Sequence, residues 1–172
     1  GYIYSQSLLA TMIRRHGEAR TEEIVRGWVA NRPVLINSDT KILEAIAAGQ
    51  CDVGLANTYY LARIRAKDPA FPVAPFWANQ QTTGTHVNVS GAGVTTHAKN
   101  RAQAIKLLEF LSSPEAQQLF ADLSFEYPAN PQAAVNRIVE RWGKFKPDDI
   151  NVAAAGEFQA AATRLADRAG YK

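Results

Sequence analysis

The sequence predicts an α/β fold, and three observations support this prediction. Residues 32–57 read as strand, helix and strand, with "RPVLIN" and "CDVGLAN" as the two strands, which is the pattern of a βαβ unit. Segments with apolar residues at helical spacing stand on both sides of this unit. The chain has 172 residues, 47% of them hydrophobic and 20% charged, which suffices for one sizeable globular unit or two small lobes.

Two helices are predicted ahead of the first strand. Residues 5–16 carry leucine, methionine and isoleucine on one face, with Ser5 as the expected N-cap and Gly17 as the stop. Residues 21–32 form the second helix, with Thr21 as its expected cap. Both helices have the apolar stripe that packs against a sheet or another helix.

The βαβ unit brings two tyrosines to a sheet edge. Its helix is expected to be capped by Ser38 or Asp39 and closed by Gly49, and the strand that follows is apolar throughout, as in a buried parallel sheet. In open α/β sheets, ligands bind outside the carboxyl ends of the strands. Tyr59 and Tyr60 come directly after such an end, at the start of a further predicted helix.

The remainder of the chain is mainly helical in pattern. A Pro-rich loop covers residues 68–84, and the strand "THVNVSGAGV" follows it. Helices are predicted over 100–112, over 113–124 with a Ser113 cap and Pro114 at its first position, and over the alanine-rich segment that ends at Gly170. Asp148 and Asp149 are expected to cap that last helix.

Composition and motifs argue against several classes of protein. The net charge of +3, without a basic run, is too small to indicate a nucleic-acid partner, and a single cysteine excludes an internal disulfide. The given chain shows no membrane span and no signal peptide. It has no motif for a nucleophile with its base, so we expect no enzyme; His16, His86 and His97 are separated and are treated as capping, structural or surface residues.

Tyrosine oxygens are the candidate metal ligands. Phenolates are hard anionic donors that suit Fe(III), and a bound trivalent ion can ionise a phenol whose pKa is ordinarily about 10. Tyr4, placed just before the first helix, is expected to share a rim with Tyr59 and Tyr60. The pattern leaves open that one ring of the pair packs in the core while the other is solvated.

The starts of two predicted helices are candidate anion sites. Ser5, Gln6 and Ser7 stand at one start, and Asp39 and Thr40 stand at the other. Free N–H groups at a helix N-terminus bind small anions. Two ordinary capped helices explain the same residues, and the pattern alone favours that interpretation.

Several motifs, in this order, resemble those of a known family. These are "IYSQSLL", "AAGQCDVGLANTYYLARI", "GTHVNVSGAGV", "LSSPEAQQLFA", "EYPANP" and "RLADRAGYK". Together they resemble the periplasmic ferric-ion binding proteins of bacterial ABC iron importers, in the extracellular solute-binding superfamily. The double tyrosine is the specific motif, whereas "SPEAQQ" is shared with binding proteins for other solutes.

The resemblance implies a periplasmic type II binding protein that carries Fe(III) to an ABC permease in the inner membrane. It implies that Tyr4, Tyr59 and Tyr60 are metal ligands. It also implies weaker roles for Ser5, Gln6 and Asn57 in holding a synergistic anion such as carbonate or phosphate. Family members with an Asn-Asn pair before the tyrosines have Asn57-Thr58 here, so the anion is not identified.

The resemblance also implies a lobe assignment. Residues 1–87 and 139–172 would form the C-terminal lobe, and 88–138 would belong to the N-terminal lobe, with a hinge near 88–90. The rest of the N-terminal lobe is absent from this chain. A sheet without its other strands exposes apolar edges, so we expect the missing lobe or a partner chain to cover them.

Two other functions remain open at the level of sequence. A lobe of the same architecture could bind a small organic or anionic solute, with the tyrosines stacking or donating hydrogen bonds. An effector domain of a transcriptional regulator is the third possibility, and it would require a DNA-binding helix-turn-helix upstream.

Overall fold

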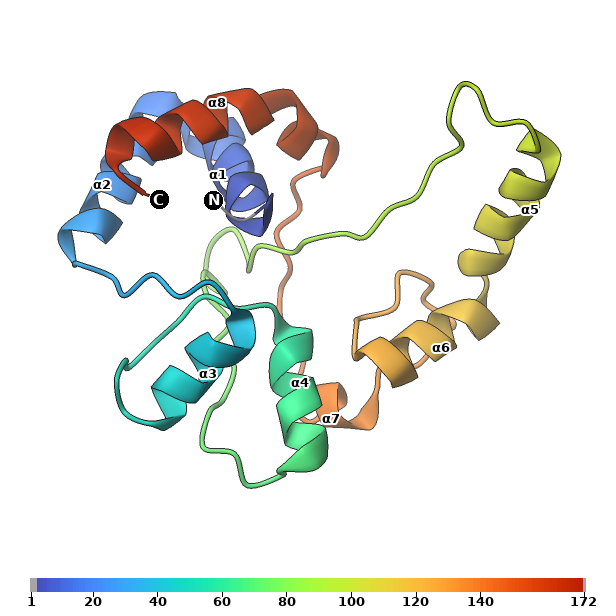
Figure 1. Cartoon of the computed structure of the whole chain (residues 1–172), viewed down its shortest axis with the longest axis horizontal. Helices are drawn as coiled ribbons and strands as arrows, with labels where there is room; N and C mark the ends of the chain where they lie inside the picture. Colours follow the sequence, from blue (N-terminus) through green and yellow to red (C-terminus); the bar gives the residue numbers. More distant parts are fainter. Residues whose placement is uncertain (1–2, 172) are drawn as a thin grey trace. The chain divides into compact units, whose positions relative to one another are not determined.

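The computed structural model describes residues 3–171, and Figure 1 shows its helices. Within this range the helices are α1 (Ile3–His16), α2 (Glu18–Ala30), α3 (Asp39–Ala47), α4 (Thr58–Lys67), α5 (Arg101–Leu111), α6 (Pro114–Ser124), α7 (Arg137–Glu140) and α8 (Ala153–Ala169). None of these helices is long and apolar enough to cross a lipid bilayer.

The described chain divides into two compact units. The first unit contains α1, α2, α8, the segment Trp77–Ser90 and the chain from Phe145 onward. The second unit contains Ile36–Phe76 and Gly91–Lys144, and thus the helices α3 to α7. The lobe assignment made from the sequence concerns a longer two-lobed protein, and it stays a prediction.

The first unit is built on a three-helix layer of α1, α2 and α8, which contact one another (Figure 1). Leu9 of α1, Val25 of α2 and Leu165 of α8 are fully buried at its centre. The buried α8 residues Ala162, Leu165 and Ala169 recur at helical spacing, and the small side chains of the two alanines let the helices approach closely. Burial of each such leucine contributes roughly 1.5–3 kcal/mol of hydrophobic stabilisation.

The second unit has a smaller core. Leu43 of α3, Leu61 of α4 and Val73 of the following loop form it, and partly buried side chains including Trp142 pack around them. Helix α4 contacts both α3 and α7, and α5 contacts α6. The core therefore fixes the position of α4, the helix that begins with the two tyrosines.

Several predicted helix ends are confirmed. The Ser38 hydroxyl accepts a hydrogen bond from the Lys41 N–H at the start of α3, and Ser113 caps α6 ahead of Pro114 in the same way. Gly17 and Gly170 follow α1 and α8 with φ of 79° and 75°, values that favour glycine. These ends depend on local backbone geometry.

Other predicted caps are wrong. Helix α1 already includes Ile3, so Ser5 lies in the helix and not at its cap. Helix α2 begins at Glu18, and the buried Thr21 donates its hydroxyl to the Gly17 carbonyl from inside the helix. A threonine can bond back to the preceding turn as readily as it caps a helix.

Asp148 and Asp149 do not cap the last helix, because α8 begins only at Ala153. Both carboxylates instead accept hydrogen bonds from Arg15 of α1, with N–O distances of 2.5 and 2.7 Å. The ion pair ties the extended segment before α8 to α1. These two carboxylates therefore take part in a long-range ion pair and not in the local cap that their position predicts.

The predicted βαβ sheet is also wrong for this chain. Its helix forms as α3, but residues 32–37 and 51–57 form no strand ladder. Among residues 3–171 the recorded bridge is a parallel one between Thr85 and Pro147. Val53 and Leu55 are 84% and 66% exposed, because a strand needs a hydrogen-bonded neighbour to bury its side chains, and the described residues supply none here.

Candidate metal-binding site

Tyr59 and Tyr60, the tyrosine pair, are the second and third residues of α4, after the N-cap residue Asn57 and Thr58. Their ring centroids are 4.4 Å apart and the ring planes are inclined by 35°. Both side chains are half-buried, and Tyr60 packs against the core of the second unit. Adjacent helical residues diverge by about 100° around the axis, so the rings come together only because both side chains lean the same way.

Arg63 lies over both rings. Its guanidinium carbon is 5.1 Å from the Tyr59 ring centroid and 5.7 Å from that of Tyr60. This is cation–π distance, and it places a permanent positive charge beside two phenols. Arg63 is not among the residues predicted from the sequence, although residues three and four positions apart are neighbours on a helix surface.

A carboxylate holds the start of α4. Asp39 Oδ2 accepts hydrogen bonds from the Asn57 backbone N–H at 3.0 Å and from Asn57 Nδ2 at 2.9 Å. Asp39 is the first residue of α3, so this contact joins the N-termini of the two helices. The sequence analysis named both residues but did not pair them, because they are eighteen positions apart.

The remaining sequence-predicted residues lie in the first turn of α1, in the first unit. The side chain of Tyr4 is 38% exposed, and its carbonyl accepts a hydrogen bond from Ser7 Oγ. Ser5 and Gln6 are half-buried, and Gln6 Oε1 accepts a 3.4 Å hydrogen bond from Gln159 Nε2 of α8. The structure thus brings Tyr59 and Tyr60 together, and it describes Tyr4 separately within the other unit.

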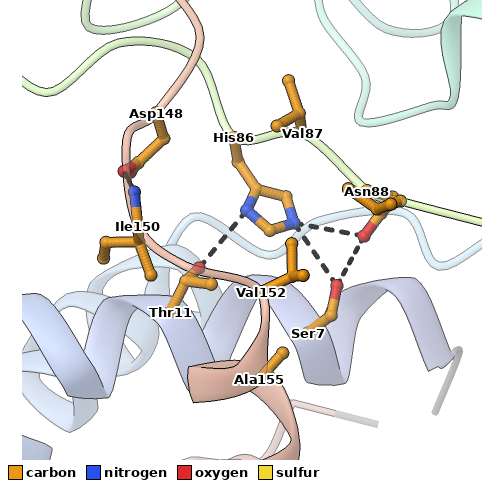
Figure 2. Close-up of a pocket in the computed structure, with 10 residues that line it drawn as sticks. Ser7, Thr11, His86, Val87, Asn88, Asp148, Ile150, Val152 and Ala155 are labelled. Carbon is orange, nitrogen blue, oxygen red and sulfur yellow. Dashed lines mark hydrogen bonds between the residues drawn. The ribbon is translucent and has the colours of Figure 1, made fainter. Parts of the chain in front are cut away.

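His86 lies at a cavity of about 250 Å³ in the first unit (Figure 2). Its Nδ1 is 3.3 Å from Thr11 Oγ1 on α1. Its Nε2 is 3.3 Å from Ser7 Oγ and 3.2 Å from Asn88 Oδ1. Burial lowers the pKa of the His86 imidazole, and the Asn88 hydrogen bond and the Asp148 charge oppose that shift. These contacts dock the segment around His86 onto α1.

The tyrosine pair has the donor chemistry of a hard-cation site. Two adjacent phenol oxygens become strong anionic ligands once a trivalent ion displaces their protons. Among residues 3–171, no group of three or more His, Cys, Asp or Glu side chains could hold a metal ion.

Comparison with protein families gives a clear match. The model for bacterial extracellular solute-binding proteins matches residues 10–147. The chain belongs to this family. The resemblance to ferric-ion binding proteins noted in the sequence is confirmed by the named relatives described next.

Curated relatives carry iron-related names. Iron uptake protein A1 of Synechocystis sp. is 39% identical over 178 residues, which cover 98% of this chain and 49% of that protein. The major ferric iron-binding protein of Neisseria meningitidis serogroup B is 28% identical over 168 residues, covering 95% of this chain and 50% of that protein. The chain spans about half the length of the curated relatives it matches.

Solved structures agree in fold. A Trichodesmium protein (IdiA, FutA) in complex with iron and citrate superposes with a TM-score of 0.92 at 42% identity, over 99% of this chain and 56% of the other. The ferric binding protein from Campylobacter jejuni gives 0.91 at 29% identity, over 98% and 56% of the two chains. The names of these relatives refer to iron uptake and to ferric-iron binding, and they do not favour the alternative of an organic solute.

Proposed function

We propose that this chain is the C-terminal portion of a ferric-iron binding protein of the type II class, in which the tyrosine pair ligates Fe(III). The observation that carries the proposal is the approach of the two rings, 4.4 Å apart and half-buried, at the start of one helix. One metal ion can reach two phenol oxygens presented in this way. We take iron as the metal because the relatives are named for iron uptake and ferric-iron binding.

Tyr4 is proposed as a third phenolate ligand once the lobes close. It stands partly exposed in the first turn of α1. Closure of a two-lobed binding protein around its ligand is a hinge motion, and residues 88–90 are its proposed hinge. Further ligands would come from the remainder of the N-terminal lobe, which this chain does not contain.

Iron binding by phenols releases protons. Each ligating hydroxyl must ionise, so acid competes with the metal for the oxygens. The affinity for iron should therefore fall as the pH is lowered.

A synergistic anion is a finer part of the proposal. Ser5 and Gln6 in the first turn of α1 and Asn57 before α4 are the proposed anion contacts. Carbonate or phosphate would suit them, and the Trichodesmium structure contains citrate as well as iron. One donor of the Asn57 amide is already directed at Asp39.

Delivery is proposed to follow the pattern of the family. The protein would act in the periplasm and hand its iron to an ABC permease in the inner membrane. The exposed apolar residues of the extended segments, such as Val53 and Leu55, would be covered by the missing lobe.

The test is a spectroscopic titration of the full-length protein encoded by the gene with ferric nitrilotriacetate. A visible phenolate-to-iron charge-transfer band should appear, and the double variant Tyr59→Phe with Tyr60→Phe should lose it. Loss of two direct ligands should weaken binding by more than the roughly 10–100-fold typical of outer-shell changes. Tyr171→Phe is the matched control, because Tyr171 packs against Trp28 in the three-helix layer. A wild-type protein that stays colourless and gains no thermal stability with iron would overturn the proposal.

A further inference from the structure

The Asp39 carboxylate, in the first turn of α3, accepts hydrogen bonds from a residue at the start of another helix, α4. Helix α3 is capped by the preceding Ser38, whose hydroxyl accepts from the Lys41 N–H, so Asp39 is not needed for that cap. Asp39 Oδ2 instead accepts two hydrogen bonds from Asn57, at 3.0 and 2.9 Å. Two donors of one residue converging on a single charged oxygen form a geometrically specific contact, which we name the Asp39 clamp.

The first turn of α4 has no side-chain cap from its own N-cap residue. Asn57 occupies its N-cap position, yet the Asn57 side chain makes no capping hydrogen bond to the helix. The Tyr60 N–H donates a hydrogen bond to the Asn57 carbonyl, and the N–O distance of 3.3 Å is at the long end of the usual range. The first turn of a helix frays when its N–H groups lack side-chain partners.

That first turn carries both rings of the tyrosine pair. Fraying there would let the two rings separate, while the rest of α4 remained anchored by the buried Leu61 and Ala62. The clamp fixes Asn57, the residue from which the turn begins, to a second helix. The half-buried position of Asp39 shields these bonds from competition with water.

We propose that Asp39 is a positioning residue for the iron site, an inference that rests on the proposed function. Through Asn57 it holds the first turn of α4 in the conformation that presents both phenol oxygens to one ion. Such preorganisation lowers the ordering cost of binding and slows ligand loss. Asp39 does not itself contact the metal in this role; its effect passes through the helix start.

The experiment compares iron release from four forms of the full-length protein encoded by the gene. These are the wild type, Asp39→Ala, Asp39→Asn and the control Glu44→Ala, which removes an exposed carboxylate from the same helix. Each is loaded with ferric nitrilotriacetate, and decay of the charge-transfer band is followed after addition of excess EDTA. The thermal midpoint of each iron-free form is measured alongside.

Asp39→Ala should release iron about tenfold faster than wild type, a ratio that corresponds to about 1.4 kcal/mol at 25 °C. Asp39→Asn keeps an oxygen that can accept both bonds from Asn57, so it should release iron at the wild-type rate. Glu44→Ala should also match the wild type. Rescue by asparagine separates the hydrogen-bond geometry from the negative charge.

The outcomes separate this inference from the proposed function. If the wild type forms no coloured complex, the iron site itself is wrong. If the wild type binds iron but Asp39→Ala releases it at the wild-type rate, or lowers only the iron-free thermal midpoint, the positioning role is wrong. If Asp39→Ala fails to fold, Asp39→Glu takes its place: it keeps the charge but shifts the carboxylate, and an unchanged release rate in that variant overturns the proposal.

Discussion

The three-helix layer and the extended segments of this chain both contain apolar side chains, but these side chains are buried in the layer and exposed in the extended segments. Leu165 in α8 is fully buried, whereas Leu55 in the segment before α4 is 66% exposed. A helix satisfies its backbone hydrogen bonds within itself, so α1, α2 and α8 needed only one another to close a core. A strand needs a neighbour along its whole length, and the described residues offer the extended segments none. The difference shows which parts of the molecule bury their apolar side chains within the described residues and which do not.

The largest expected effect comes from truncating one leucine in each region. Leu165→Ala should lower the free energy of unfolding by roughly 2–5 kcal/mol, because it leaves a cavity in the layer. Leu55→Ala in the same 172-residue chain should change it by less than about 0.5 kcal/mol. Urea unfolding followed by circular dichroism measures both. Equal losses would show that the extended segment is already packed, and the comparison would fail.

Glycine substitutions give the next largest contrast. Gly84, which follows the turn at residues 78–83 in the first unit, has φ of 90°, and an added Cβ would stand 2.5 Å from the Pro147 carbonyl oxygen. Gly84→Ala should therefore destabilise the chain by roughly 1–3 kcal/mol. Gly27→Ala in α2 meets nothing within 4 Å and should stabilise it by roughly 0.5–1 kcal/mol. Thermal unfolding of the two variants should thus shift in opposite directions, and shifts of the same sign would contradict this account.

The smallest effect is a pH dependence at His86, where an extended segment does pack on a helix. Burial holds the pKa of its imidazole below the ordinary value of 6.5, so the unfolded chain takes up the proton more readily. The stability from neutral His86 is complete above pH 6.5 and is lost as the pH falls through the folded-state pKa. His86→Gln should flatten the decline in thermal midpoint between pH 7 and pH 5. The exposed His97→Gln should leave it unchanged, and an equally steep decline in both variants would exclude His86 as the cause.

What the sequence could predict follows the same division. Ser38, Ser113 and Gly170 mark helix ends correctly, because a cap depends on a few adjacent residues. The two predicted strands do not form, because an apolar pattern leads to a buried strand only where neighbouring strands are present to pair with it. Asp148 and Asp149 were assigned a local role, although Arg15, more than one hundred and thirty positions away, determines their contacts.

The candidate site was predictable in its residues but not in its geometry. The motif around Tyr59 and Tyr60 identifies the phenols, while the approach of their rings depends on side-chain rotamers that spacing does not reveal. Arg63 could have been found from helical periodicity. The Asp39 clamp could not, because it depends on how α3 and α4 pack.

The packing of α8 against α1 has a consequence for synthesis in the cell. Helices α1 and α2 leave the ribosome before α8, and Leu9 and Val25 become fully buried only when α8, which begins more than one hundred residues after α2 ends, has emerged. Throughout that interval an apolar face is open to chaperones and to other nascent chains. A premature stop before Ala153 would yield a polypeptide with a half-built core, which we expect quality-control proteases to remove.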